Sequence, residues 1–224
     1  MRPPSNKKVN ITEITLNEAL PAVFKGEPPR HSDVWQTSLT LHKGKHYIIA
    51  AESGTGKSSL CAYIYGSRRD YLGNISFDGR DIRDLKIPDW QDIRRTAFAY
   101  LPQDLGLFPE LTAEENIKMK NDLTGHLSPE RIDALLSRLG IETRKDFPVG
   151  KMSIGQQQRV GIIRAICQPF DFIFLDEPVS HLDEQNNRIV ASIVEEEAAA
   201  QGAAIISTSV GNHLLLSDAI TLNL

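Results

Sequence analysis

The chain has 224 residues, which is enough for one large domain with its own core and no covalent staples. Hydrophobic residues make up 41% and charged residues 24%, and Gly and Pro occur at ordinary levels, so collagen-like and low-complexity proteins are excluded. The net charge of −4 argues against nucleic-acid binding through bulk positive charge, so no nucleic-acid partner is expected.

The sequence also bears on the compartment. No apolar run approaches the roughly 18–20 residues of a membrane helix, and the basic N-terminus is not followed by the apolar segment of a signal peptide. Cys61 and Cys167 are far apart and lack a metal-binding pattern, which is typical of buried thiols in a reducing compartment. We therefore expect a cytoplasmic protein, which would work at the inner face of a membrane only through a partner.

Hydrophobic periodicity predicts the elements in chain order. Strands are predicted at 11–16, 38–41, 46–51, 75–79, 96–101, 172–175, 203–206 and 219–222, with a loop at 27–30. Helices are predicted at 58–65, 112–119, 130–139, 153–167, 183–201 and 213–216. Strands and helices alternate at both ends of the chain, which predicts an α/β core with a mostly parallel sheet. The middle predicts an all-helical insertion, so the expected divisions are core at 1–103, helical subdomain at 104–167 and core again at 168–224.

A Gly-rich loop follows the apolar strand at 46–51 and precedes a helix, which is the context of a phosphate-binding P-loop (Walker A motif). Glycines let backbone N–H groups turn toward phosphate oxygens, and the helix N-terminus adds partial positive charge. Lys57 is expected to reach the β and γ phosphates, and the Ser58 hydroxyl to ligate Mg²⁺. Ala51 replaces the first Gly of the pattern, which is tolerable with a negative φ. The candidate nucleotide-binding residues are Glu52, Ser53, Gly54, Thr55, Gly56, Lys57, Ser58 and Ser59.

Two carboxylates follow the apolar strand at 172–175. The carboxyl ends of strands are where open α/β sheets bind ligands. Asp176 is suited to hold Mg²⁺, and Glu177 to polarise an attacking water. An acidic pair at a strand end is also compatible with simple solvation, but the upstream phosphate loop favours the functional interpretation.

The segment Met152-Ser-Ile-Gly-Gln-Gln-Gln-Arg159, between these two motifs, resembles the signature loop of the ATPase subunits of ABC transporters, which reads S-G-G-Q before Q-Q-R. The resemblance covers almost the whole chain. Gln103 matches the glutamine that senses the γ-phosphate and contacts the metal, and Ser180-His-Leu-Asp183 matches the D-loop. Phe24 lies where the family places an aromatic that stacks on adenine.

This resemblance implies a P-loop NTPase core with a mostly parallel sheet, an N-terminal antiparallel β part and an inserted helical subdomain. It implies a homodimer, or a pair with a related ATPase subunit, that traps ATP and Mg²⁺. Each ATP would lie between Lys57 of one chain and Ser153, Gly155 and Gln156 of the other, with Asp183 nearby. Hydrolysis would open the dimer and act on a transmembrane permease subunit.

The segment at 100–111 is similar to the lipoprotein-release and macrolide-export branch of the family. In that branch Leu107 and Phe108 would help to form an apolar groove for a helix of the membrane subunit. The alternative, that both pack inside the helical insertion, is equally compatible with the sequence.

The chain departs from the family pattern at two further positions. Ile154 replaces the first Gly of the signature, so its branched side chain must point away from the nucleotide or weaken closure. Ser209 stands where the family has a switch histidine; it can donate one hydrogen bond but cannot carry a charge near neutral pH. We expect slow turnover with Glu177 intact, and His213, four residues later, is a weaker candidate for a substitute.

Two other functions remain open at this point. One is a soluble ABC ATPase without a transporter, although this chain has a single cassette and no heptad run. The other is a regulator that binds ATP but barely hydrolyses it, which Ala51, Ile154 and Ser209 favour. Neither the transported substrate nor the direction of transport can be read from the sequence.

Overall fold

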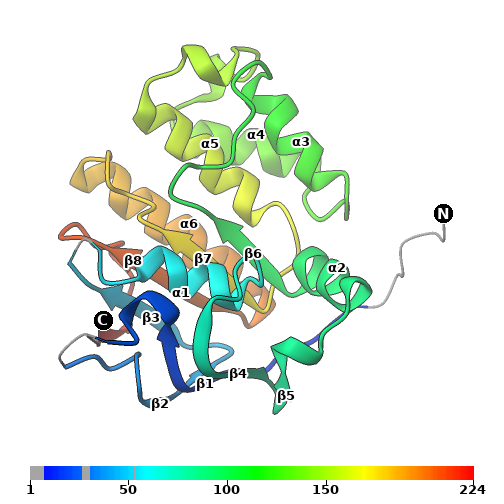
Figure 1. Cartoon of the computed structure of the whole chain (residues 1–224). Coiled ribbons are helices and arrows are strands. Elements are labelled where there is room, and N and C mark those ends of the chain that lie inside the picture. Colours follow the sequence, from blue (N-terminus) through cyan, green and yellow to red (C-terminus); the bar gives the residue numbers. More distant parts are fainter. Residues whose placement is uncertain (1–7, 27–30, 53) are drawn as a thin grey trace.

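The computed structural model describes residues 8–26, 31–52 and 54–224, and Figure 1 shows a β-rich part below a helical part. Its strands are β1 (Glu13–Pro21), β2 (Ser38–His42), β3 (His46–Ala50), β4 (Tyr71–Phe77), β5 (Arg80–Asp81), β6 (Phe98–Leu101), β7 (Phe172–Asp176), β8 (Ala204–Ser209) and β9 (Ile220–Asn223). Its α-helices are α1 (Lys57–Ile64), α2 (Ile87–Thr96), α3 (Ala113–Asn121), α4 (Pro129–Arg138), α5 (Ile154–Ile166) and α6 (Glu184–Gln201). The loop predicted at 27–30 lies outside the described residues.

The strands form two sheets. An antiparallel sheet has the order β2-β1-β4-β5, and a parallel sheet has the order β6-β7-β8-β3-β9. The predicted α/β class with a mostly parallel sheet and an antiparallel β part is therefore confirmed. In the parallel sheet β8 separates β3, which leads into the Gly-rich loop, from β7, which leads into Asp176 and Glu177.

The apolar run of β7 is explained by burial on both faces of the sheet. Ile173 and Leu175 belong to a core shared with α3, α4, α5 and α6. Phe172 and Phe174, which alternate with them, belong to a second core shared with α1, α2 and the antiparallel sheet. A strand covered on both faces needs apolar residues at every position.

Capping residues mark the starts of the helices in the helical part. Thr112 accepts a hydrogen bond from the N–H of Glu115, whose carboxylate accepts one in return, and Ser128 caps α4. The segment between β6 and β7 contains helices α3 to α5 and short 3₁₀ turns, as the predicted insertion requires. The division at 103 and 167 stays a prediction.

One local prediction was wrong, and one helix was missed. Residues 213–216 do not form a helix: the buried Asn187 side chain of α6 donates to the carbonyl of His213 and accepts from the N–H of Leu215, so it holds this stretch in an irregular path. Helix α2 was not predicted, although Pro88 near its start and the bond from the Lys86 N–H to the Asp89 carboxylate are ordinary start signals. Because α2 continues to Thr96, the following strand begins only at Phe98.

Both cysteines are free and buried, as expected. Burial raises the pKa of Cys61, and it raises the pKa of Cys167 to about 12, so both thiols are protonated at neutral pH. Within the described ranges no helix is both long and apolar enough to cross a bilayer.

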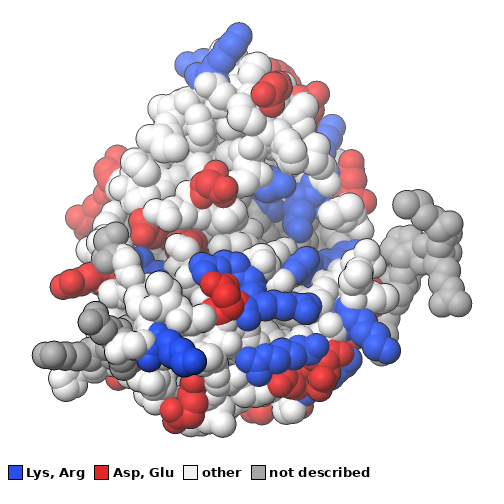
Figure 2. Space-filling view, in the orientation of Figure 1, with Lys and Arg blue, Asp and Glu red and all other residues white. Residues whose placement is uncertain are grey.

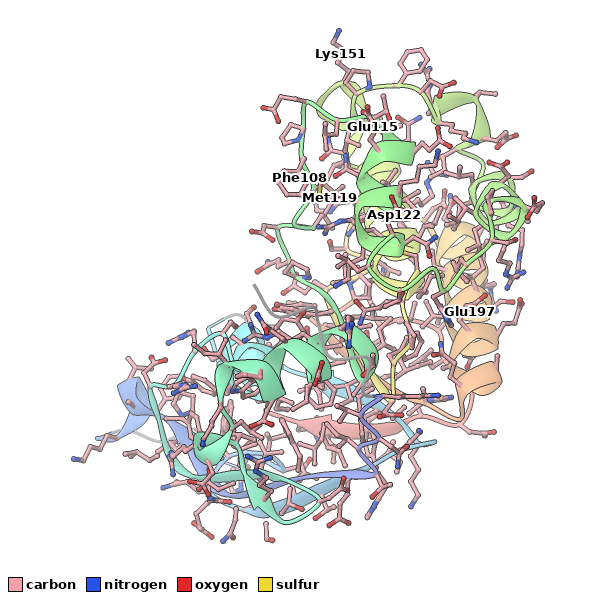
Figure 3. All side chains as sticks on the ribbon, turned by 90° about the vertical axis from the view of Figure 1, so that its right-hand side faces the viewer. Phe108, Glu115, Met119, Asp122, Lys151 and Glu197 are labelled. Carbon is pink, nitrogen blue, oxygen red and sulfur yellow. The ribbon has the colours of Figure 1, made fainter. Side chains whose placement is uncertain are left out.

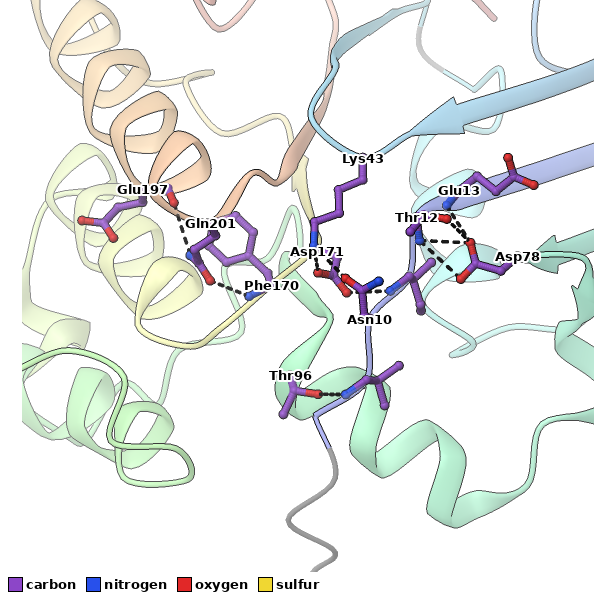
Figure 4. Close-up of polar contacts among 12 residues, drawn as sticks. Asn10, Thr12, Glu13, Lys43, Asp78, Thr96, Phe170, Asp171, Glu197 and Gln201 are labelled. Carbon is purple, nitrogen blue, oxygen red and sulfur yellow. Dashed lines mark hydrogen bonds and ion pairs between the residues drawn. The ribbon is translucent and has the colours of Figure 1, made fainter.

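A buried carboxylate joins the N-terminal segment to the parallel sheet (Figure 4). Asp171, just before β7, accepts a hydrogen bond from the Ile11 N–H at 2.8 Å and pairs with Lys43 through its other oxygen. On the far side of the same segment, Asp78 accepts from the Thr12 N–H at 3.0 Å. These contacts fix where β1 enters its sheet.

We predict that Asp171→Ala lowers the free energy of unfolding by about 3 kcal/mol, because it leaves Lys43 and the Ile11 N–H without their buried acceptor. Urea denaturation measures this. Arg188→Ala, which removes an exposed ion pair with Glu184 on α6, should leave stability unchanged within error. A loss below about 1 kcal/mol for Asp171→Ala would contradict the anchoring role.

Candidate functional site

The Gly-rich loop is packed tightly against two aromatic rings. Helix α1 follows Gly56, whose φ of 98° is one that L side chains rarely adopt, and a β-carbon there would lie 3.3 Å from the Trp35 ring and 3.4 Å from the Phe24 ring. The Trp35 indole N–H also donates to the Thr55 carbonyl at 3.1 Å. Ala51 does not have a positive φ, so it is tolerated as expected. Phe24 thus lies beside the loop, while Trp35 escaped the sequence analysis.

Lys57 is 5% exposed and is held by its own loop. Its Nζ donates to the Glu52 carbonyl at 2.9 Å and lies 4.0 Å from a carboxylate oxygen of Glu177. Thr55 Oγ1 donates to the same carbonyl. The structure therefore brings Lys57 and Glu177 together, as an active site would require. Ser59 Oγ instead accepts from Arg68 at 2.9 Å, so its role toward a nucleotide stays a prediction.

Ser53 lies outside the described residues. Gly54, with a φ of 86°, has open space where a β-carbon would be. This leaves the loop backbone accessible on that side.

Asp176 has one oxygen engaged and one oxygen free. Its Oδ1 accepts from Thr208 Oγ1 at 2.5 Å, whereas its Oδ2 is buried and has no hydrogen-bond partner in the part of the chain that the structure describes. Asp176, Ser58 and Gln103 line one open hollow of about 470 Å³. A carboxylate, a hydroxyl and an amide oxygen at one place fit Mg²⁺, which prefers oxygen ligands and usually takes few from protein.

Across the described ranges, no three His, Cys, Asp or Glu side chains gather into a metal cage. Mg²⁺ beside a nucleotide usually takes phosphate and water oxygens in addition to a few protein ligands.

Glu177 has a left-handed backbone, with a φ of 52°. Its N–H donates to the Thr208 carbonyl at 3.2 Å, and its own carbonyl accepts from Gln158 of α5 at 3.3 Å. Gln158 also donates to Ser180 Oγ at 2.9 Å and accepts from the His181 N–H. A strained residue held from both sides is typical of a functional site. The sequence analysis did not single out Gln158 or Thr208.

The signature residues lie at the start of α5, in the helical part of Figure 1. Ser153 caps the helix by accepting from the Gln156 N–H, and the Gln156 side chain accepts from the Ser153 N–H. A β-carbon on Gly155 would lie 3.2 Å from the His181 carbonyl oxygen, so this glycine permits close packing on the D-loop. Ile154 is 47% exposed, so its side chain projects from the body of the chain.

The remaining predicted residues occupy element ends. Asp183 caps α6 by accepting from the Asn186 N–H at 2.8 Å, and this bond lowers the pKa of the Asp183 carboxyl. Ser209 ends β8 opposite Ala50, and its hydroxyl hydrogen-bonds His213. The structure therefore places Ser209 at the carboxyl ends of the parallel strands, the same end of the sheet that carries the P-loop and Asp176.

Comparison with known proteins agrees with this geometry. The family model described as ABC transporter matches residues 34–180. The chain belongs to the ABC transporter family. Its core is the ATPase domain of that family, similar to the ATP-binding parts of export systems.

Three relatives illustrate this membership. The chain is 34% identical over 80% of its length to a pyoverdine export ATP-binding/permease protein of Pseudomonas putida and to a macrolide export ATP-binding/permease protein of Bordetella avium. It spans only 28% of the length of each. It is also 31% identical, over 81% of its length and 79% of the relative, to the ABC transporter ATP-binding protein YtrE of Bacillus subtilis.

Solved structures show the same fold. The dimeric structure of a bacterial ABC transporter cassette matches with a TM-score of 0.75 at 24% identity, covering 94% of both chains. A bacterial Atm1-family ABC exporter with ATP bound matches with a TM-score of 0.72 at 24% identity, covering 94% of this chain and 36% of the exporter. At this identity the likeness carries the cassette fold and no more.

We predict that Thr208→Val weakens Mg²⁺-dependent ATP binding about 10-fold, because the Asp176 carboxylate loses the bond that orients it. Isothermal titration with and without Mg²⁺ measures this. Ser207→Ala is the matched control: its buried hydroxyl has no hydrogen-bond partner among the described residues, so its removal should leave binding unchanged. Equal weakening in the absence of Mg²⁺ would contradict a role in the metal site.

Proposed function

We propose that this chain binds ATP with Mg²⁺ and hydrolyses it, as the ATPase subunit that drives a separate transmembrane permease. The observation that carries the proposal is the grouping at the carboxyl ends of the parallel strands. Asp176 has a buried oxygen that bonds to none of the described residues and shares a hollow with Ser58 and Gln103, and Glu177 lies 4.0 Å from Lys57. This arrangement matches the needs of phosphoryl transfer, which are positioning and charge.

Each residue then has a defined task. The backbone N–H groups of 54–58 and the start of α1 bind the phosphates, and Lys57 exchanges its bond to the Glu52 carbonyl for phosphate oxygens. Asp176, Ser58 and Gln103 would hold Mg²⁺, which supplies positive charge to the phosphates when bound. Glu177 accepts a proton from the attacking water. Phe24, beside Gly56, offers its ring to the adenine base.

The proposal includes a head-to-tail dimer. In the single chain Lys57 contacts Glu177, whereas Ser153 and Gly155 contact their own helix and the D-loop. The start of α5 is exposed and presents a helix N-terminus, which favours a γ-phosphate brought by a second subunit. A solved cassette of the same fold is dimeric, which is a precedent for two such chains pairing.

A surface between the helical and β-rich parts supports a membrane partner. Figure 2 shows Lys and Arg side chains gathered where the molecule is hollowed between these parts. Burial lowers the pKa of Lys120 and of Arg164, and neither forms an ion pair within the described chain. Two half-buried cations without a carboxylate are costly in an isolated chain, and a partner that brings one would stabilise them.

Apolar side chains border these cations. Phe108 is 44% exposed, and the Arg164 guanidinium lies 5.8 Å from the centre of its ring. Figure 3 shows Met119 on the same side of α3 as Phe108. Leu107, in contrast, packs on the helical core. Of the two residues expected to meet a helix of the membrane subunit, Phe108 is therefore the more accessible. An amphipathic helix of a permease, with an acidic residue, fits this surface, so the chain would lie at the cytoplasmic face of the membrane.

Ser209 favours a second candidate function, a slow ATP-dependent clamp. Its hydroxyl has no positive charge to place near the γ-phosphate, and Ile154 adds an exposed branched side chain to the signature. Turnover separates the two functions.

We expect the purified chain to hydrolyse ATP with Mg²⁺ at a rate per subunit that rises with protein concentration. Glu177→Gln should reduce the rate about 100-fold or more while ATP still binds, because the amide cannot accept the proton. Phosphate release measures this, and Glu184→Gln, on the exposed start of α6, should match the wild type. Tight ATP binding without turnover would favour the clamp, and no ATP binding would overturn both functions.

We expect Arg164→Glu to weaken binding of the purified chain to membrane vesicles from the cells that make it about 10-fold or more, because a partner carboxylate would then meet like charge. Co-sedimentation measures this. The ATP affinity of the Arg164→Glu variant should stay at the wild-type value. The control variant Arg188→Glu on α6 should bind vesicles as the wild type does. Unchanged vesicle binding by Arg164→Glu would contradict the assigned surface.

A further inference from the structure

We propose that His213 is a positioning residue for ATP hydrolysis that acts through the Ser209 hydroxyl, so that a serine–histidine pair replaces the single histidine expected at position 209. The inference rests on the proposed ATPase function. If the inference holds, replacing the switch histidine by Ser209 does not remove the imidazole from the site, because His213 supplies one through the Ser209 hydroxyl.

The register of the sheet places Ser209 at the site. β8 lies between β7 and β3, with Thr208 opposite Asp176 and Ser209 opposite Ala50. The Ala51 N–H, at the entry to the Gly-rich loop, donates to the Ser209 carbonyl at 3.3 Å. Ser209 thus lies at the carboxyl end of the strand between the phosphate loop and the carboxylates, where an open α/β sheet binds its ligand.

The Ser209 side chain has a defined hydrogen-bond partner. Ser209 is 2% exposed, and its Oγ hydrogen-bonds Nδ1 of His213. A hydroxyl can accept one hydrogen bond and donate another at the same time. When His213 carries the Nδ1 proton and donates to Oγ, the hydroxyl proton is left for a phosphate oxygen, and the imidazole supplies polarisation that serine alone lacks.

The segment that carries His213 is held in place by other residues. Asn187, buried on α6, donates to the His213 carbonyl at 2.8 Å and accepts from the Leu215 N–H at 3.0 Å. Asn212 donates to the Val179 carbonyl at 3.1 Å, two residues after Glu177. The backbone is therefore fixed without the imidazole, so the ring is not needed to hold its own loop.

The test compares His213→Ala in two backgrounds, wild type and Ser209→Ala, with turnover and the ratio of ATP to ADP affinity as readouts. In the wild type, His213→Ala should lower kcat about 10-fold or more and reduce the preference for ATP over ADP, with KM changed less than about 3-fold. In Ser209→Ala the same change should have no further effect, because the relay is already cut. His42→Ala, which changes an exposed residue at the end of strand β2, is the control and should match the wild type.

Two further variants sharpen the test. His213→Asn, whose amide N–H can take the place of Nδ1–H, should keep most of the wild-type rate. Ser209→His should make His213 dispensable, provided that circular dichroism shows a folded chain.

The outcomes distinguish a role of His213 through Ser209 from a structural role. An equal loss from His213→Ala in both backgrounds would assign a structural role and overturn the inference, as would no loss in the wild type. If the wild type binds ATP without turnover, the proposed hydrolysis fails, and the affinity ratio alone decides the inference. If the wild type binds no ATP, both proposals fall.

Discussion

Burial of β7 on both faces is the constraint on which the rest of the site depends. Phe172 and Phe174 pack on one side and Ile173 and Leu175 on the other, so the strand is fixed where it delivers Asp176. The ring of Phe98 contacts Phe174 edge-on at 5.3 Å between centroids. Close packing of this kind leaves little freedom. The carboxylate at the strand end is therefore already in place when a ligand arrives.

The parallel sheet brings the candidate site residues together, and the helical part contacts them. Because β8 lies between the phosphate-loop strand and the carboxylate strand, its end contacts both: Thr208 donates to Asp176, and the Ser209 carbonyl accepts from the Ala51 N–H. The helical part adds Gln158, and it adds Lys120 and Arg164, which form no ion pair among the described residues. The proposed nucleotide site and the proposed partner surface thus share α5, which carries both Gln158 and Arg164.

The sequence predicted what short local patterns encode. The Gly-rich loop, the pair Asp176-Glu177 and the cap at Ser153 are each contiguous, so their chemistry can be recognised without knowing the fold. Thr208 and Asp176 are 32 positions apart, and Gln158 and Ser180 are 22 apart, so these contacts exist only once the sheet is assembled. The wrong helix at 213–216 has the same cause, since a distant asparagine outweighs a weak local preference.

Gln158 connects the start of α5 to Glu177. Its amide holds both the carbonyl of Glu177 and the hydroxyl of Ser180, and it stands little more than one turn from the start of α5. A displacement of that helix end would therefore act on the backbone of Glu177, the residue proposed to activate water. In the proposed dimer that end belongs to the neighbour's nucleotide, so the two nucleotides cannot be processed independently. Rate against ATP concentration should then be sigmoidal, and one inactive subunit should impair its active partner.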